Sequence, residues 1–529
     1  MTREPPADRL QAPLPGGIDQ RIRMKKLVTT AASAAVLALA AGCGSTADGG
    51  SGGGEGQVVL GMSYAAETLD PDLLAFRHQW TYTDPIYDSL TLKDGDGSIN
   101  PQLATEWVGG KDDAGFYIDF TLREGLSFPD GAKFGADTVL ANVDRSINLP
   151  GSTNKTGFAG VAVEKLDDSH VRFRSAAGVG ALPATLAGPE GMMISQDAIA
   201  GKVDLTKSAV GISPYSVESV QPSRVVYKAN DGYWNPEAIG AKSLVIEMMP
   251  DDARLNAVLA GNMDITTLPT RMMQTAENAG KNADVGKGNQ NFVFLLNSDI
   301  KPLDDLRVRQ AMSMALDRKS FCDGVWEGQC DAVGQFFAPG SVMSDPALGL
   351  SLTPFDVDKA KKLVEEAGAV GSKFELIHNA GFAQMSDLAG YAQSQWAKIG
   401  LDVTLTPLAP AQAVGRFTGE KNAAMMLSAT GNAFDPSLDV ERILLPTGLY
   451  NVAQLPDPKV EAAAAAGKIE TDHDARVKTY RQISGDAVGN GQMIPLVSQF
   501  NAFAVAPSIK GWSQPWGLNF VSLRGVFNG

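Results

Sequence analysis

The fold can be read most directly from one run of residues: Asn100-Pro-Gln-Leu-Ala-Thr-Glu-Trp107, Phe116-Tyr-Ile-Asp-Phe-Thr-Leu122 and Phe128-Pro-Asp-Gly-Ala-Lys-Phe-Gly-Ala-Asp-Thr-Val139. Apolar and polar side chains alternate over residues 116–122, which predicts a half-buried strand. Asp130-Gly131 is a turn dipeptide. The apolar spacing from Asp137 to Ile147 predicts a helix. This run therefore predicts a strand, a turn and a helix in that order.

Beyond this run, strand and helix patterns alternate along the chain. Leu122 and Phe128 are expected in the core, and Arg123 and Asp137 are a candidate ion pair. Further strands are expected at residues 58–62, 223–228, 242–249, 292–296 and 401–405. Further helices are expected at residues 252–260, 304–316, 356–367, 388–399 and 474–488. This alternation predicts a mixed α/β protein of two lobes.

Length and charge bound the class of protein. The chain has 529 residues and a net charge of −15, which is long enough for at least two domains. Such an acidic chain is not held by nucleic acid or anionic lipid through general electrostatics. We therefore expect no nucleic-acid partner.

The N-terminal segment has the pattern of an export signal. Basic residues between Arg21 and Lys26 precede an apolar run, Ala31–Ala41, which is too short to span a bilayer. Cys43 follows small residues and resembles the lipobox cysteine of bacterial lipoproteins, which carries acyl chains such as palmitate. We expect residues 1–42 to be an upstream extension and signal peptide, with Met1 or Met24 as the start, and 43–57 to be a Gly/Ser-rich tether. An ordinary secreted protein with a chance cysteine is the alternative.

Cys322 and Cys330 lie eight residues apart, and in an oxidising exported compartment they predict a local disulfide. A redox or metal pair is the alternative, but the spacing is not CxxC and no histidine lies nearby. The four histidines are scattered along the chain. We therefore expect no metal, no cofactor and no catalysis by this chain.

Two segments imitate known binding loops. Residues 280–288 resemble a P-loop but lack its spacing and its Ser/Thr, so we expect a solvated polar loop. Residues 94–98 resemble the start of an EF-hand, but Ile99 occupies the position that needs glycine. A hairpin turn is the better interpretation there.

The opening run, together with further motifs in a fixed order, resembles the extracellular solute-binding proteins of family 5. These are the peptide, nickel and oligosaccharide receptors of ABC importers. The other motifs include Thr68-Leu-Asp-Pro71, Gly211-Ile-Ser-Pro-Tyr215, Asn230-Asp-Gly-Tyr-Trp234, Leu259-Ala-Gly-Asn-Met-Asp-Ile265, Pro302-Leu-Asp-Asp-Leu-Arg-Val-Arg-Gln-Ala311 and Ile494-Pro-Leu496. Each motif is short, and it is their order across residues 58–515 that makes the resemblance specific.

The resemblance implies an α/β, two-lobed fold of the periplasmic-binding-protein (Venus-flytrap, type II) class, which closes around a ligand at a hinge. Lobe I would comprise residues 58–297, with an extra subdomain at about 96–209. Lobe II would comprise residues 298–497, and residues 498–529 would return to lobe I. The crossings would fall near Leu296-Asn297 and Ser498–Phe500.

The resemblance also suggests ligand contacts. In peptide-binding relatives an aspartate four residues before an acidic-Pro proline meets the peptide amine, because a buried ammonium needs a charged partner. Asn432 stands at that place here, which favours a neutral or differently oriented solute unless Asp435 is the partner. The remaining candidates are aromatic or amide side chains, which suit sugar or peptide-like ligands but are also common in cores: Trp80, Tyr82, Phe336, Phe434, Gln499 and Phe500.

From these features we expect a monomeric receptor, exported and anchored through Cys43 at the outer face of the cytoplasmic membrane. It would capture an oligopeptide or similar small polar solute and deliver it to the permease subunits of an ABC importer. Two alternatives stay open. One is a secreted hydrolase acting on oligosaccharide or peptide through paired carboxylates, and the other is a structural or chaperone-like surface lipoprotein.

Overall fold

The computed structural model describes residues 56–529 except 75–78, 95–96, 381–382, 432–434 and 514–519. The expected signal peptide, Cys43 and nearly all of the tether lie outside the described residues, as do Asn432 and Phe434. Within the described part of the chain, no helix combines the length and apolarity needed to cross a membrane.

One sheet of eleven strands forms the centre of the fold. Its order is β15-β14-β16-β12-β17-β11-β1-β10-β9-β8, and β13 pairs with β17 off this path. Two long strands, β12 (Asn282–Leu296) and β17 (Met493–Val505), lie at its middle and pair in antiparallel fashion. The remaining strands are β1 (Gln57–Met62), β8 (Tyr215–Gln221), β9 (Arg224–Ala229), β10 (Ser243–Met248), β11 (Ile265–Thr267), β13 (Cys330–Ala332), β14 (Lys373–Asn379), β15 (Asp402–Leu408) and β16 (Met425–Thr430).

Separate hydrophobic cores pack on the two ends of this sheet. Strands β1 and β8–β11 carry one group of buried residues, which we call lobe I. Strands β13–β16 carry a second group, lobe II. The helices of lobe I are α1 (Trp80–Thr83), α2 (Ala136–Asn148), α3 (Leu182–Thr185), α4 (Asp251–Leu259) and α5 (Met273–Asn278). Those of lobe II are α6 (Leu306–Met314), α7 (Arg318–Gly324), α8 (Val357–Glu366), α9 (Ala383–Lys398), α10 (Pro410–Val414), α11 (Pro436–Ile443), α12 (Pro458–Ile469) and α13 (His473–Gly489).

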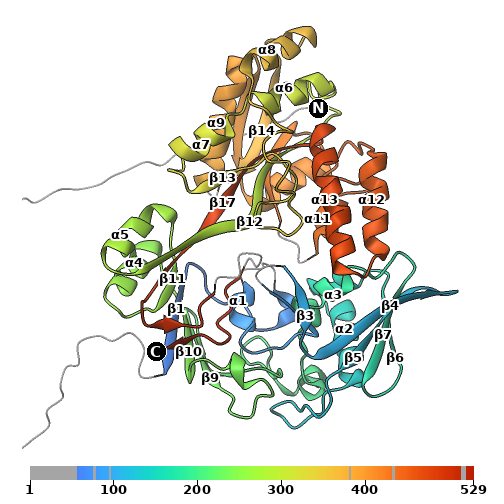
Figure 1. Cartoon of the computed structure of the whole chain (residues 1–529), viewed down its shortest axis with the longest axis vertical. Helices are drawn as coiled ribbons and strands as arrows, with labels where there is room; N and C mark the ends of the chain where they lie inside the picture. Colours follow the sequence, from blue (N-terminus) through green and yellow to red (C-terminus); the bar gives the residue numbers. More distant parts are fainter. Residues whose placement is uncertain (1–55, 75–78, 95–96, 381–382, 432–434, 514–519) are drawn as a thin grey trace, which may run out of the picture. The chain divides into compact units, whose positions relative to one another are not determined.

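The two long strands connect the cores. Figure 1 shows β12 and β17 running side by side from the helices of lobe II to α4 and α5 of lobe I. In β12, Ala283 packs on a lobe I core, whereas Phe292, Phe294 and Leu296 pack on a lobe II core. The change of core in β12 therefore precedes the crossing expected at Leu296-Asn297. In β17 it falls between residues 497 and 502.

A second sheet belongs to lobe I and contains residues 116–122, the predicted half-buried strand. Its order is β4-β5-β7-β6, built from β4 (Ala104–Asp112), β5 (Gly115–Leu122), β6 (Ala162–Lys165) and β7 (His170–Ser175). Ile118, Phe120 and Leu122 are buried on one face of β5, as the alternation predicts. A short hairpin of β2 (Thr91–Lys93) and β3 (Ile99–Pro101) precedes this sheet, so the expected hairpin is present.

The C-terminal segment returns to lobe I. The guanidinium of Arg524 lies 2.8 Å from a carboxylate oxygen of Asp88 and 3.3 Å from one of Asp84. Asp88 also accepts hydrogen bonds from Tyr233 and Trp234. Since Asp84 and Asp88 are buried and the Arg524 side chain is 13% exposed, the ion pairs hold residues 520–529 against the start of lobe I. The short strands β18 (Ile509–Lys510) and β19 (Phe527–Asn528) pair nearby.

Two local expectations are wrong. The expected polar loop at residues 280–288 is strand from Asn282 onward, because it pairs with residues 500–505 of β17. Arg123 does not pair with Asp137. The Arg123 guanidinium lies 4.0 Å from the ring centre of Trp234, and Asp137 accepts from Lys165 at 2.9 Å.

Candidate functional site

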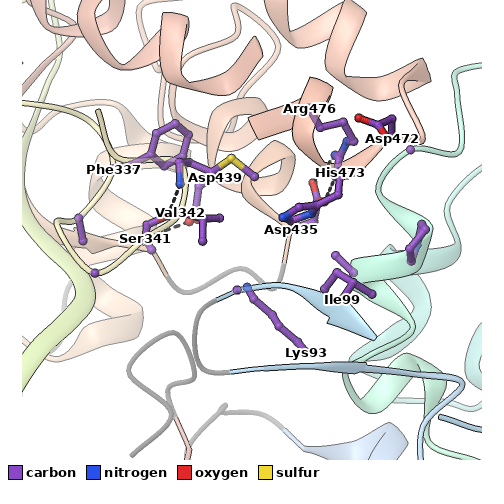
Figure 2. Close-up of a pocket in the computed structure, with 18 of the residues that line it drawn as sticks. Lys93, Ile99, Phe337, Ser341, Val342, Asp435, Asp439, Asp472, His473 and Arg476 are labelled. Carbon is purple, nitrogen blue, oxygen red and sulfur yellow. Dashed lines mark hydrogen bonds and ion pairs between the residues drawn. The ribbon is translucent and has the colours of Figure 1, made fainter. Parts of the chain in front are cut away.

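A cavity of about 270 Å³ lies between the two lobes. Lobe I contributes the β2–β3 hairpin, Trp107 of β4 and the start of α3. Lobe II contributes the loop at residues 336–343, the end of β16 and the starts of α11 and α13. The lining residues include Lys93, Ile99, Trp107, Gly180, Pro183, Ala184, Phe336, Phe337, Val342, Met343, Thr430, Asp435, Asp439, Asp472, His473 and Arg476. In Figure 2, Lys93 and Ile99 of lobe I lie on one side of the cavity, and Val342, Asp435 and Arg476 of lobe II lie on the other.

The lobe II wall is built around a buried ion pair. Asp435 begins α11 and accepts from the backbone N–H of Ser437 at 2.9 Å. Arg476 of α13 donates to Asp435 through both terminal nitrogens, and the Nη2–Oδ1 distance is 2.8 Å. Burial alone would raise the pKa of Asp435, but the charge and hydrogen bonds of Arg476 hold it below its ordinary value. The carboxylate of Asp435 is thus ionised and already paired.

The loop that faces this pair is apolar. Phe336 and Phe337 pack edge to face with ring centres 4.9 Å apart. The backbone carbonyl of Phe336 accepts from Asn291 Nδ2 of β12 at 2.9 Å, which ties the loop to the strand that connects the lobes. Together with Ile99, Trp107 and Val342, this surface suits an apolar or aromatic group rather than a second charge.

The N-terminal end of α13 forms the third side of the cavity. Asp472 caps the helix by accepting from the backbone N–H of Ala475 at 2.9 Å. Thr471 and His473 lie beside it on the cavity wall. Of the acidic side chains on this wall, Asp472 caps α13, Asp435 is paired with Arg476, and Asp439 accepts from the backbone N–H of Gly431 at 2.9 Å.

Of the described residues expected to contact ligand, Phe336 and Asp435 line this cavity. Asn432 and Phe434, outside the described residues, stand in sequence between two lining residues, Gly431 and Asp435.

Trp80 and Tyr82 are buried in lobe I instead. The Trp80 ring packs 5.8 Å from that of Phe520, and the Tyr82 hydroxyl donates to the carbonyl of Tyr64 at 2.7 Å. These two aromatics therefore pack within the lobe.

Gln499 and Phe500 lie in β17, where the strand passes between the cores. Gln499 lines a second cavity of about 470 Å³, together with Arg271 of lobe I and Trp326 and Asp387 of lobe II. Phe500 lines neither cavity and donates its backbone N–H to the carbonyl of Gln329 at 3.2 Å. The expected contacts are thus divided between two cavities and the protein interior.

Cys322 and Cys330 are joined by a disulfide in the structure, with their Cα atoms 5.4 Å apart. Trp326, inside the loop that this bond closes, packs against Phe321 and Phe292. Among the described residues, no group of three or more His, Cys, Asp or Glu side chains could hold a metal ion.

Sequence reasoning missed the starts of α3 and α13 as cavity walls. One signal was available at α13, since Asp472 directly before a helical pattern predicts an N-cap. No pattern indicated that Gly180 or Pro183 of lobe I would face it, because such contacts depend on the packing of lobes that are far apart in sequence.

Comparisons with known proteins agree with this architecture. A model described as bacterial extracellular solute-binding proteins, family 5 Middle, matches residues 98–451. The chain is 26% identical over 420 residues to di/tripeptide-binding protein 3 of Pseudomonas aeruginosa, covering 72% of this chain and 78% of that protein. It is 25% identical over 484 residues to the glutathione-binding protein GsiB of Salmonella typhi, covering 87% and 92%.

The fold is shared with solved structures. The ABC transporter substrate-binding protein CtaP of Listeria monocytogenes superposes with a TM-score of 0.77 at 21% identity, covering 90% of this chain and 99% of CtaP. The predicted mixed α/β, two-lobed binding-protein fold is therefore confirmed.

Proposed function

We propose, since this chain belongs to family 5 of the bacterial extracellular solute-binding proteins, that it captures a short peptide or peptide-like solute between its lobes and delivers it to the permease subunits of an ABC importer. The observation that supports this proposal is the cavity lined by both lobes, in which an apolar, aromatic wall lies opposite backbone and polar groups. We propose that Phe336 and the Asn432–Asp435 segment contact the solute, together with Gln499 and Phe500 of the crossing strand β17.

We further propose that the chain acts as an exported monomer without catalysis of its own. Cys43 would carry the lipid that holds it at the outer face of the cytoplasmic membrane, and the Gly/Ser segment after it would give the receptor reach. The names of two relatives, a di/tripeptide-binding and a glutathione-binding protein, support a peptide-like solute. The carboxylate of Asp435 is already bonded to Arg476, so a peptide amine would need a different partner.

Calorimetric titration of the purified chain with dipeptides, tripeptides and glutathione tests this proposal. We expect saturable binding by at least one of these probes, and its loss in Ile99→Trp, which fills the cavity from the β2–β3 hairpin. Val370→Trp, at a side chain that is 60% exposed, is the matched control and should bind like the parent. Turnover of a bound peptide by the pure chain, or no binding by any probe, would contradict the proposal.

The role of Asn432 is tested separately. Asn432→Asp would supply the carboxylate that a peptide ammonium requires. We expect it to increase the preference for peptides with a free amine over the same peptides carrying an N-acetyl group. An equal preference in the parent and the variant would show that residue 432 does not contact the peptide amine.

A further inference from the structure

The turn between α12 and α13 rests directly against lobe I. The backbone N–H of Gly180 donates to the carbonyl of Lys468 at 2.9 Å. In Figure 1 the ends of α12 and α13 that this turn joins lie next to α3 and β4. Lobe I and lobe II therefore touch here, through a backbone hydrogen bond, as well as through the strands that connect them.

Three glycines make this contact close enough to form. A Cβ atom placed on Gly180 would lie 2.0 Å from the carbonyl oxygen of Glu470, and one on Gly178 would lie 2.4 Å from that of Lys468. On Gly109 of β4, a Cβ would lie 2.5 Å from Cγ2 of Thr471. We call these three residues the glycine seat. While the turn rests on it, no larger residue fits at these positions without a shift.

The seated turn is part of the cavity wall. Gly180 and Pro183 line the cavity from lobe I, and Thr471 and Asp472 line it from the turn. Arg476, whose guanidinium holds Asp435, also donates through Nε to the carbonyl of Gly467 at 2.9 Å. Because one buried guanidinium bonds both segments, the Asp435 wall and the turn are held as one unit.

We propose that the glycine seat is the closing contact of this receptor: residues 467–472 of lobe II dock on Gly109, Gly178 and Gly180 when the cavity is enclosed and leave them when it opens. The proposal rests on the proposed function, because a permanently closed protein would not need a contact that can release. The contact is small and formed largely by backbone, so it suits an equilibrium that a solute can shift. Its strength would set the closed fraction of the protein without solute.

Hydrogen exchange of the full chain without any solute tests the seat. The Gly180 amide reports the contact, since its partner belongs to the other lobe. Thr471→Trp adds bulk on the lobe II side without changing residue 180, and we expect exchange of that amide to become about tenfold faster or more. Thr404→Trp, on an exposed position of β15, is the control and should leave the rate unchanged. Equal rates at Gly180 in Thr471→Trp and the parent would overturn the proposal.

A second variant approaches the contact from lobe I. Gly180→Ala should enlarge the radius of gyration of the full chain in solution scattering, whereas Gly232→Ala, with open space around the new methyl, should not. An unchanged radius in a Gly180→Ala chain of native circular dichroism would also overturn it. Neither measurement uses a solute, so a failure of peptide binding and a failure of the seat are separately visible.

Discussion

Asp435 and Arg476 form a buried ion pair in the cavity wall. Their side chains are 0% and 6% exposed, so each charged group is removed from water and is stabilised by its partner instead. Removing one partner of a buried ion pair leaves an uncompensated charge, which typically costs about 3–5 kcal/mol. Arg476→Leu should therefore lower the free energy of unfolding by about that amount, as measured by urea denaturation.

The control for this variant lies on the same helix. Lys478→Leu removes a positive charge from an exposed position of α13, and surface substitutions of this kind are usually within about 0.5 kcal/mol. If both variants lost the same stability, the general charge of α13, and not the buried pair, would be responsible.

The same pair predicts how stability depends on pH. The folded pKa of Asp435 is held below its unfolded value by Arg476. The ionised carboxylate therefore stabilises the fold above the unfolded pKa, and this stabilisation is lost as the pH falls through the folded pKa. Asp435→Asn should be less stable than the parent at pH 7 and should lose less stability between pH 5 and pH 3. An exposed counterpart, Asp474→Asn, should keep the parent's acid profile. Parallel profiles for Asp435→Asn and the parent would contradict the assignment.

Single elements were predictable where their pattern was local. The alternation of residues 116–122 predicts β5 to within one residue of its observed bounds, and the apolar spacing of residues 137–147 does the same for α2. Strand β12 was predicted only at Phe292–Leu296, because residues 282–291 are polar and Gly-rich. Their extended form comes from pairing with β17 about 210 residues later in the chain, which no local pattern encodes.

The site was predictable only in part, because its contacts also join segments that are far apart in sequence. Phe336 and Asp435 reach the cavity, but Trp80 and Tyr82 do not. An aromatic residue in a polar segment has the same sequence signature whether it packs in a core or faces a ligand. Only its neighbours distinguish the two, and those neighbours, Phe520 and Tyr64, lie on other segments.

The disulfide acts at the scale of one element. It closes the loop between α7 and β13, and β13 pairs with residues 497–499 of β17 where that strand passes between the lobes. In the chain-entropy account, closing so short a loop contributes about 2–3 kcal/mol. Replacing Cys322 and Cys330 together with Ala should lower the free energy of unfolding by about that amount. Dithiothreitol should reproduce the loss in the parent and leave the double variant unchanged, and a parent insensitive to the reductant would contradict a stabilising role.

At the scale of the whole molecule, the described residues form two sets of cores on one sheet, linked by β12 and β17. Residues in the middle of these strands, between Lys287 and Asn291, show a register shift against β17. A break in pairing between two well-packed cores is where a hinge costs least, because few apolar contacts must be given up there. The shared sheet would thus keep the lobes in one order while the cavity opens and closes.

The proposed attachment to the membrane also concerns the whole chain. Stable anchoring needs more than one acyl chain, and a lipidated N-terminal cysteine supplies at least two. Cys43→Ser should therefore move the protein from the detergent phase to the aqueous phase in a two-phase extraction of expressing cells, and should abolish its labelling by radioactive palmitate. Ser51→Ala, within the same Gly/Ser segment, should partition and label like the parent. Because no described residue of the solute cavity is altered, peptide binding by the released Cys43→Ser protein should be unchanged. A Cys43→Ser chain that stayed in the detergent phase would show that something other than this cysteine holds the receptor at the membrane.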